Sequence, residues 1–235
     1  QTVSDRTIRR VFNATKGFTG PWVMLPGNHD AALAESVWTR AQRLGAVPEN
    51  VHLALQHGVI DLEPQKLSIL CAPLTQRNTY GDLTEPFSGY ESPEGFARIG
   101  LAHGSVQGLL PDDIDSTNPI APDRAEASLL DYLALGDWHG TKQINDRTWY
   151  SGTPEPERFR NNDAGNALMV EVAEPGATPK VTQLPTGRYQ WHQWREALAV
   201  QSDLEQLLDR LGTLPDSAVV DLRLEGSVTL AGEET

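Results

Sequence analysis

The sequence predicts an α/β protein with one substantial core and a small appendage. At 235 residues with 39% hydrophobic composition, the chain is long enough for one large domain and an extension. Three short apolar runs each stop at a glycine-flanked loop that carries a histidine. Helical spacing of apolar residues occurs near both ends of the chain, so strands and helices are both expected.

The amino-terminal residues predict a helix followed by a buried strand. The segment Ser4–Gly17 has a capping residue, apolar side chains at Ile8, Val11 and Phe12, and a terminal glycine. Trp22–Leu25 is a short apolar run closed by a Pro-Gly pair, which is typical of a strand that ends abruptly at a loop.

The same order of apolar run and polar loop recurs twice. Arg98–Ala102 leads into His103 and a glycine, and Tyr132–Leu135 leads into the loop Gly136–Gly140. Ligands of α/β sheets bind beyond the carboxyl ends of the strands. We therefore expect the three histidine-bearing loops to converge on one site.

Between these strands the chain predicts further strands and long loops. The runs His52–Gln56 and Leu67–Leu74 are expected to be strands joined by a turn, with Cys71 as a buried thiol rather than a nucleophile. The segments Thr75–Gly95 and Pro111–Asp123 are polar and broken by proline, which predicts long surface loops.

The last third of the chain predicts a hairpin and then a separate small module. Ala167–Val172 and Lys180–Leu184 are expected to be strands around a Glu-Pro-Gly turn. After Gly187, the pattern Ser202–Glu205 indicates a capping box with Ser202 as the first capping residue, followed by leucines at helical spacing. Val219–Leu224 then alternates like a half-buried strand.

Composition limits the classes of protein that fit. A single cysteine excludes a disulfide framework and agrees with a reducing cytoplasm, and no run reaches the roughly 18 apolar residues of a membrane helix. We therefore expect a soluble, cytoplasmic protein without a membrane partner. The net charge of −13 argues against tight DNA binding by this chain alone. It argues less against a metal-dependent nuclease, whose cations invert the local field, and solubility explains most of the acidity.

The sharpest chemical signal is the run Gly27-Asn28-His29-Asp30. An Asn amide oxygen is a neutral, hard ligand for a divalent cation. The adjacent His29 could reach a phosphoryl oxygen or a leaving group, and Asp30 could hydrogen-bond the imidazole to fix its tautomer. A Gly-Asn turn with an incidental histidine is the alternative explanation.

Two later strand ends supply further candidate ligands. On its own, His103 would be interpreted as a structural histidine. It follows an apolar strand that ends at a loop in the same way as Trp22–Leu25, and this position makes it a candidate ligand. Asp137 and His139 are separated by one residue, so in an extended segment they project to the same side and could address two neighbouring cations.

In order, these residues resemble the third, fourth and fifth motifs of the calcineurin-like metallophosphoesterases: Gly-Asn-His-Asp, a lone histidine, and Gly-His-x-His. The run Thr148–Phe159 is similar to a Tyr-x-Gly-Ser/Thr-Pro-Glu-x-x-x-Phe segment of SbcD-type DNA double-strand-break repair nucleases. The resemblance implies a β-sandwich flanked by helices over residues 1–186. Over residues 187–235 it implies, more loosely, the start of a small α+β capping domain that positions DNA.

The resemblance also implies a two-metal phosphodiesterase. It implies that one divalent cation is bound by Asn28, His103 and Asp137. It implies that the other cation is bound by His139. His29 would act at the transition state, oriented by Asp30. Mn²⁺ is the expected metal, with Mg²⁺ and Fe²⁺ as alternatives. The implied activity is that of an exonuclease or endonuclease subunit on DNA ends, which forms a homodimer and pairs with an SMC-like coiled-coil ATPase.

The sequence departs from the family pattern in two ways. The opening Asp-x-His and Gly-Asp-x-x-Asp motifs do not lie upstream of Gly27, so we expect a further segment before Gln1. Without its bridging carboxylate, this stretch alone could be inactive. Asp137 stands where the family usually has a histidine, and a carboxylate ligand would alter metal preference.

Two other functions remain open. A metallophosphoesterase that acts on a small nucleotide or phosphoester is favoured by the acidic charge and disfavoured by the Tyr150–Phe159 run. A non-catalytic scaffold for a partner ATPase is the other alternative, and it would hold at most one weakly bound ion.

Overall fold

The computed structural model of the chain describes residues 3–108, 117–159 and 162–226. The helices in these ranges are α1 (Asp5–Thr15), α2 (Val37–Arg43), α3 (Arg124–Ala127) and α4 (Gln201–Gly212), with 3₁₀ turns η1 (Glu63–Gln65) and η2 (Glu85–Gly89). The strands are β1 (Trp22–Met24), β2 (Val51–Leu53), β3 (Gly58–Leu62), β4 (Leu67–Ala72), β5 (Ala97–His103), β6 (Ser105–Val106), β7 (Pro119–Ile120), β8 (Tyr132–Gly136), β9 (Lys142–Gln143), β10 (Thr148–Tyr150), β11 (Asn166–Glu171), β12 (Lys180–Pro185), β13 (Gln190–Leu198) and β14 (Ala218–Gly226).

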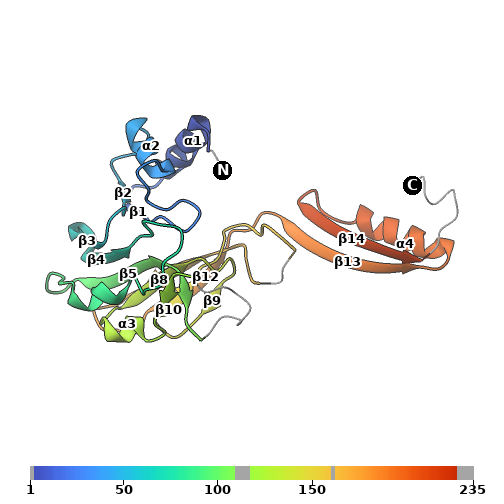
Figure 1. The fold of residues 1–235 in the computed structure, drawn as a ribbon. Coiled ribbons are helices and arrows are strands. Elements are labelled where there is room, and N and C mark those ends of the chain that lie inside the picture. Colours follow the sequence, from blue (N-terminus) through green and yellow to red (C-terminus); the bar gives the residue numbers. More distant parts are fainter. Residues whose placement is uncertain (1–2, 109–116, 160–161, 227–235) are drawn as a thin grey trace.

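A mixed six-stranded sheet forms the centre of the molecule, which confirms the α/β prediction (Figure 1). Its strand order is β3-β4-β5-β8-β10-β9, with parallel pairing from β4 through β10 and antiparallel strands at both edges. Because β4 to β10 run in the same direction, their carboxyl ends meet at one edge of the sheet.

Both faces of the central sheet are covered, as the apolar runs predict. Along β4, Leu70 belongs to one buried cluster with Phe87, Leu133 and Tyr150, whereas the neighbouring Cys71 belongs to a cluster on the other face. Burial raises the pKa of the Cys71 thiol to about 12, so Cys71 is the inert core residue that the sequence predicts.

The amino-terminal layer consists of α1 and α2 against the parallel pair β1-β2 (Figure 1). The Ser4 hydroxyl accepts a hydrogen bond from the Thr7 backbone, which confirms the predicted helix start. Ile8 and Phe12 are buried, whereas Val11 is exposed. The short helix α2 was not predicted.

Between residues 52 and 95, one expectation is wrong and a second holds in part. The strands expected over His52–Gln56 and Leu67–Leu74 are not joined by a turn, because β3 and η1 lie between them and β3 pairs with β4. The segment Thr75–Gly95 is not simply a surface loop, since its turn η2 carries the fully buried Phe87 into the core. Of the loop predicted over Pro111–Asp123, residues 111–116 lie outside the described ranges.

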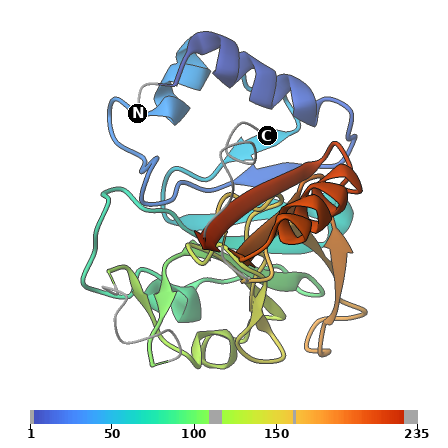
Figure 2. The same cartoon turned by 90° about the vertical axis from the view of Figure 1, so that its right-hand side faces the viewer.

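In the carboxyl-terminal third, the strands β11, β12 and β14 match the predicted ones, whereas the strand β13 was not placed from the sequence. The hairpin β11-β12 is antiparallel, and β13 and β14 form a parallel pair against which α4 packs (Figures 1 and 2). In Figure 1 this β13-α4-β14 unit projects away from the central sheet. Ser202 is not the capping residue: α4 begins at Gln201, and the Asp203 carboxylate accepts hydrogen bonds from the Ala199 and Val200 backbone.

Within the described ranges, every helix is too short or too polar to cross a membrane.

Candidate metal centre at the carboxyl edge of the sheet

Three of the predicted ligands meet at the carboxyl edge of the sheet. His103 Nε2 lies 3.2 Å from Asn28 Oδ1 and 3.3 Å from Asp137 Oδ1. Asn28 Nδ2 donates to the same Asp137 oxygen at 3.3 Å. These side chains come from loops or strand ends far apart in the sequence, so the convergence that the strand endings predict is present for them.

Strand register places two members of the cluster next to each other. His103 is the last residue of β5 and pairs with Gly136, the last residue of β8, so Asp137 follows directly beside it. Successive residues of a strand point to opposite faces, and a shift of one residue would turn the His103 ring away.

Glycines make room for the imidazole of His103. A Cβ atom at Gly27 would lie 2.6 Å from His103 Cε1, and one at Gly136 would lie 2.8 Å from His103 Nδ1. Both distances are shorter than ordinary van der Waals contact. The glycines that flank the predicted motifs therefore allow the ring to sit between two main-chain segments.

The loop that carries Asn28 is braced by main-chain hydrogen bonds. The backbone N–H of Ala32 donates to the Leu74 carbonyl at 2.8 Å, so the loop after β1 is fixed to the segment after β4. The indole N–H of Trp38, from the unpredicted helix α2, donates to the Asp30 carbonyl at 2.6 Å. Asn28 is thus held by two elements that sequence reasoning did not connect with it.

The backbone of Asp137 has a left-handed conformation, with φ of 105°. This region costs a non-glycine residue on the order of 1–3 kcal/mol, and such residues cluster at functional sites. Its side chain is 27% exposed, so solvent and small ions can reach the carboxylate. A strained, accessible carboxylate in a cluster of ligand-type side chains is what a binding site requires.

The donor atoms of the cluster fit a hard divalent cation. Such a cation holds its ligands at about 2.0–2.2 Å, so adjacent ligand atoms in an octahedral shell lie about 3 Å apart. The separations of His103 Nε2 from Asn28 Oδ1 and Asp137 Oδ1 are close to that spacing. Carboxylate, amide oxygen and imidazole nitrogen are also ligands that Mn²⁺ accepts.

The candidate centre includes an amide side chain in addition to acidic and histidine side chains. Within the described ranges, no group of three or more His, Cys, Asp or Glu side chains is placed to hold a metal ion. The centre combines two such residues with the amide of Asn28, and it does not include His139.

The predicted catalytic pair, His29 and Asp30, is arranged differently from the expectation. His29 is exposed to solvent. Asp30 Oδ1 accepts a hydrogen bond from the Gly27 backbone at 2.7 Å, and no hydrogen bond joins it to His29 in the described part of the chain. The carboxylate therefore stabilises the loop, because a neighbouring backbone N–H is a closer partner than the adjacent side chain.

His139 follows Asp137 by two residues but contacts a different partner. Its Nδ1 forms a hydrogen bond with Glu157 Oε1, and both side chains are partly exposed. Glu157 also accepts from Arg158 at 2.8 Å. Sequence reasoning missed Glu157, since a separation of 18 residues through a turn leaves no periodic signal.

Tyr150 is a second supporting residue that sequence reasoning missed. Its buried hydroxyl donates to the Gly104 carbonyl at 2.7 Å and accepts from the Val106 backbone at 3.0 Å. Burial, the main cause, raises the pKa of the phenol, so it stays protonated and able to donate. Tyr150 thereby fixes the loop directly after His103.

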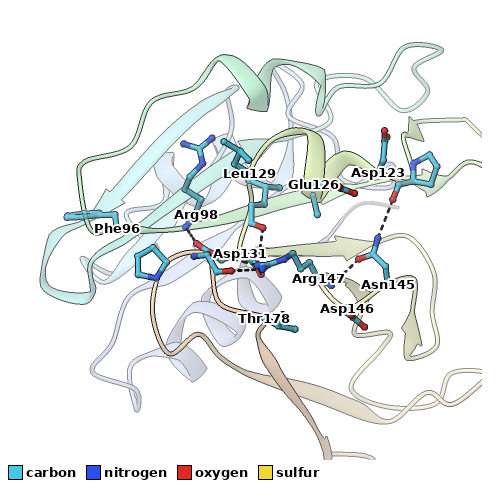
Figure 3. A pocket seen from close by; sticks show the side chains of 15 residues that line it. Phe96, Arg98, Asp123, Glu126, Leu129, Asp131, Asn145, Asp146, Arg147 and Thr178 are labelled. Atoms are coloured by element: carbon cyan, nitrogen blue, oxygen red, sulfur yellow. Dashed lines mark hydrogen bonds and ion pairs between the residues drawn. The ribbon is translucent and has the colours of Figure 1, made fainter.

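A large cavity lies at the opposite edge of the sheet, at the amino ends of β5, β8 and β10. Its volume is about 910 Å³. Figure 3 shows Asp131 there between the backbone of Arg98 and the side chain of Arg147. Asp131 accepts from the backbones of Arg98 (2.7 Å) and Gly176 (2.6 Å), and the Arg147 guanidinium donates to the carbonyls of Asp131 and Gly176. These groups are already paired with main chain, so size alone does not make this cavity the chemical site.

Comparisons with known proteins add no family assignment. No protein-family model matches the chain, and a search of curated proteins found no matching relative.

Proposed function

We propose that this chain is part of a metal-dependent phosphodiester hydrolase of the calcineurin-like metallophosphoesterase kind, with a β-sandwich core and a capping domain from residue 187. The observation that carries the proposal is the meeting of Asn28, His103 and Asp137 within 3.2–3.3 Å of one another. Carboxylate, amide and imidazole groups at the carboxyl ends of strands suit a cation that binds a substrate phosphate.

In this proposal the residues have distinct roles. Asn28, His103 and Asp137 hold one divalent cation, most suitably Mn²⁺, and His139 contributes to a second. A pair of such cations supplies a hydroxide nucleophile and neutralises the phosphate. His29, which is exposed and adjacent in sequence to Asn28, stabilises or protonates the leaving oxygen, while Asp30 keeps the loop in place through Gly27.

The substrate we propose is the phosphodiester backbone at DNA ends, in a cytoplasmic double-strand-break repair complex. This choice depends on the similarity of Thr148–Phe159 to SbcD-type nucleases. The homodimer and the SMC-like coiled-coil ATPase belong to the same proposal. They are compatible with the net charge of −13, because a partner could supply a basic surface for DNA.

A hydrolase that acts on small phosphoesters is the second candidate, and the acidic charge is the observation in its favour. The deciding experiment uses the full-length protein that carries this chain, with Mn²⁺. Hydrolysis of linear DNA is compared with hydrolysis of bis-p-nitrophenyl phosphate and cyclic nucleotides. Cleavage of DNA supports the nuclease, and cleavage of the small esters alone supports the second candidate. Absence of both activities, with at most one weakly bound ion, would favour a scaffold for a partner ATPase.

A further inference from the structure

The ring of His139 is held from one side by a carboxylate that lies outside the three-residue cluster. Its Nδ1 contacts Glu157 Oε1. A carboxylate oxygen can only accept, so the ring nitrogen that faces it carries the proton in the neutral imidazole. The lone pair of a neutral ring held in this way is on Nε2.

The loops that carry His139 and Glu157 are packed together as one unit. The His139 carbonyl accepts from the Thr153 backbone at 3.0 Å and from the Thr153 hydroxyl at 3.2 Å. Gly152 lies so close to Gly140 that a Cβ atom on it would sit 2.5 Å from the Gly140 carbonyl carbon. The loop of His139 is therefore fixed to the start of the segment that leads to Glu157.

Glu157 is suited to act as an acceptor. Glu157 Oε1 faces His139 Nδ1 and also accepts from the Arg158 guanidinium at 2.8 Å. By contrast, Glu155 of the same run accepts from the Arg188 and Tyr189 backbones, so it supports the main chain instead of a ring.

We infer that Glu157 is a positioning residue for His139: it accepts the Nδ1 proton and leaves Nε2 as the nitrogen available to a divalent cation. Metal-binding histidines commonly donate their other ring N–H to a carboxylate, which fixes both tautomer and ring orientation. This inference deepens the proposed function and rests on it for the metal. The alternative is an exposed ion pair without a role, which would contribute little to stability.

The first test measures the tautomer of His139 in the metal-free protein by long-range ¹H–¹⁵N correlation, at a pH of about 8, where an ordinary imidazole is neutral. We expect the Nδ1–H form in the wild type and a shift to Nε2–H in Glu157→Ala. Glu157→Gln should keep the Nδ1–H form, because its amide oxygen still accepts. Glu94→Ala, which removes an exposed glutamate elsewhere, is the matched control. A wild-type ring in the Nε2–H form, or a Glu157→Ala ring unchanged from wild type, would overturn the inference.

The second test is Mn²⁺ binding by calorimetry on the same proteins. Loss of a carboxylate that orients a ligand typically weakens metal affinity by about 10–100-fold, and we expect that range for Glu157→Ala with near wild-type affinity for Glu157→Gln. Equal affinity in Glu157→Ala and wild type would contradict the positioning role. If the wild type binds no Mn²⁺, the proposed function fails, while the tautomer measurement still decides the role of Glu157.

Discussion

The two edges of the central sheet use polar residues in opposite ways. At the amino edge, Asp131 and Arg147 have partners in the main chain around a large cavity. At the carboxyl edge, His103 and Asp137 contact each other and Asn28. Polar groups paired with backbone rigidify a fold, whereas polar groups that face one another on a strained, accessible loop leave room for a ligand. We therefore expect substitutions at the amino edge to change stability and substitutions at the carboxyl edge to change metal binding.

The largest expected effect concerns the carboxyl edge. Replacement Asp137→Ala should weaken Mn²⁺ binding by about 100-fold or more, about 3 kcal/mol, because a charged ligand is lost. Calorimetric titration measures the change. Asp146→Ala, which removes an exposed carboxylate at the opposite edge, should bind Mn²⁺ like the wild type. Equal affinity in the two variants would remove the distinction between the edges.

At the amino edge, Asp131→Asn should lower the free energy of unfolding by about 2–3 kcal/mol. The carboxylate of Asp131 accepts one backbone N–H at each oxygen, whereas an amide has only one oxygen that can accept. The change also leaves the nearby Arg147 guanidinium without its counter-charge. Urea denaturation gives the value, and Mn²⁺ affinity should not change. Asp123→Asn, which changes an exposed carboxylate, is the control. If it lowers the free energy of unfolding as much as Asp131→Asn does, the stabilising role assigned to Asp131 is wrong.

Crowding of the His103 ring should have a smaller effect on Mn²⁺ affinity. In Gly136→Ala the new methyl group would begin 2.8 Å from His103 Nδ1, so the ring must move. We expect Mn²⁺ affinity to fall by about tenfold, as for other changes that disturb ligand orientation. Gly81→Ala, where the added atom meets nothing within 4 Å, should leave affinity unchanged. An unaffected Gly136→Ala would mean that ring position is not critical.

The smallest effect isolates the backbone strain at Asp137. The variants Asp137→Gly and Asp137→Ala both lack the carboxylate, and only glycine adopts φ of 105° without penalty. We expect Asp137→Gly to be more stable than Asp137→Ala by about 1 kcal/mol in thermal unfolding. Equal stability would show that the loop relaxes around alanine.

The strands that end in glycine-flanked loops were predictable from sequence because length, apolar character and abrupt glycine endings coincide in them. The strand β3 and the helix α2 were missed, since both are short and carry no clear period. The strand β1 pairs with β2 outside the central sheet. This pairing depends on tertiary contacts, which the local sequence pattern does not reveal. Phe87 shows the same limit: a polar, proline-containing segment predicts a loop but not the single side chain that anchors it.

For the candidate site, sequence order indicated Asn28, His103 and Asp137 correctly as neighbours, because parallel strands bring their carboxyl ends together. The roles of adjacent residues were harder to assign. Asp30 was expected to orient His29, yet it binds a backbone N–H three residues earlier. Glu157 could not be found from spacing, since its approach to His139 depends on the turn between them. The metal, the reaction and the partners remain predictions.

Asn28 and Asp137 are separated by 109 positions in the sequence. An ion bound between them would act as a removable cross-link between two segments that lie far apart along the polypeptide. At a free concentration 100 times its dissociation constant, such an ion adds about 2.7 kcal/mol to the native state. The lifetime of the folded protein would then follow the local supply of metal.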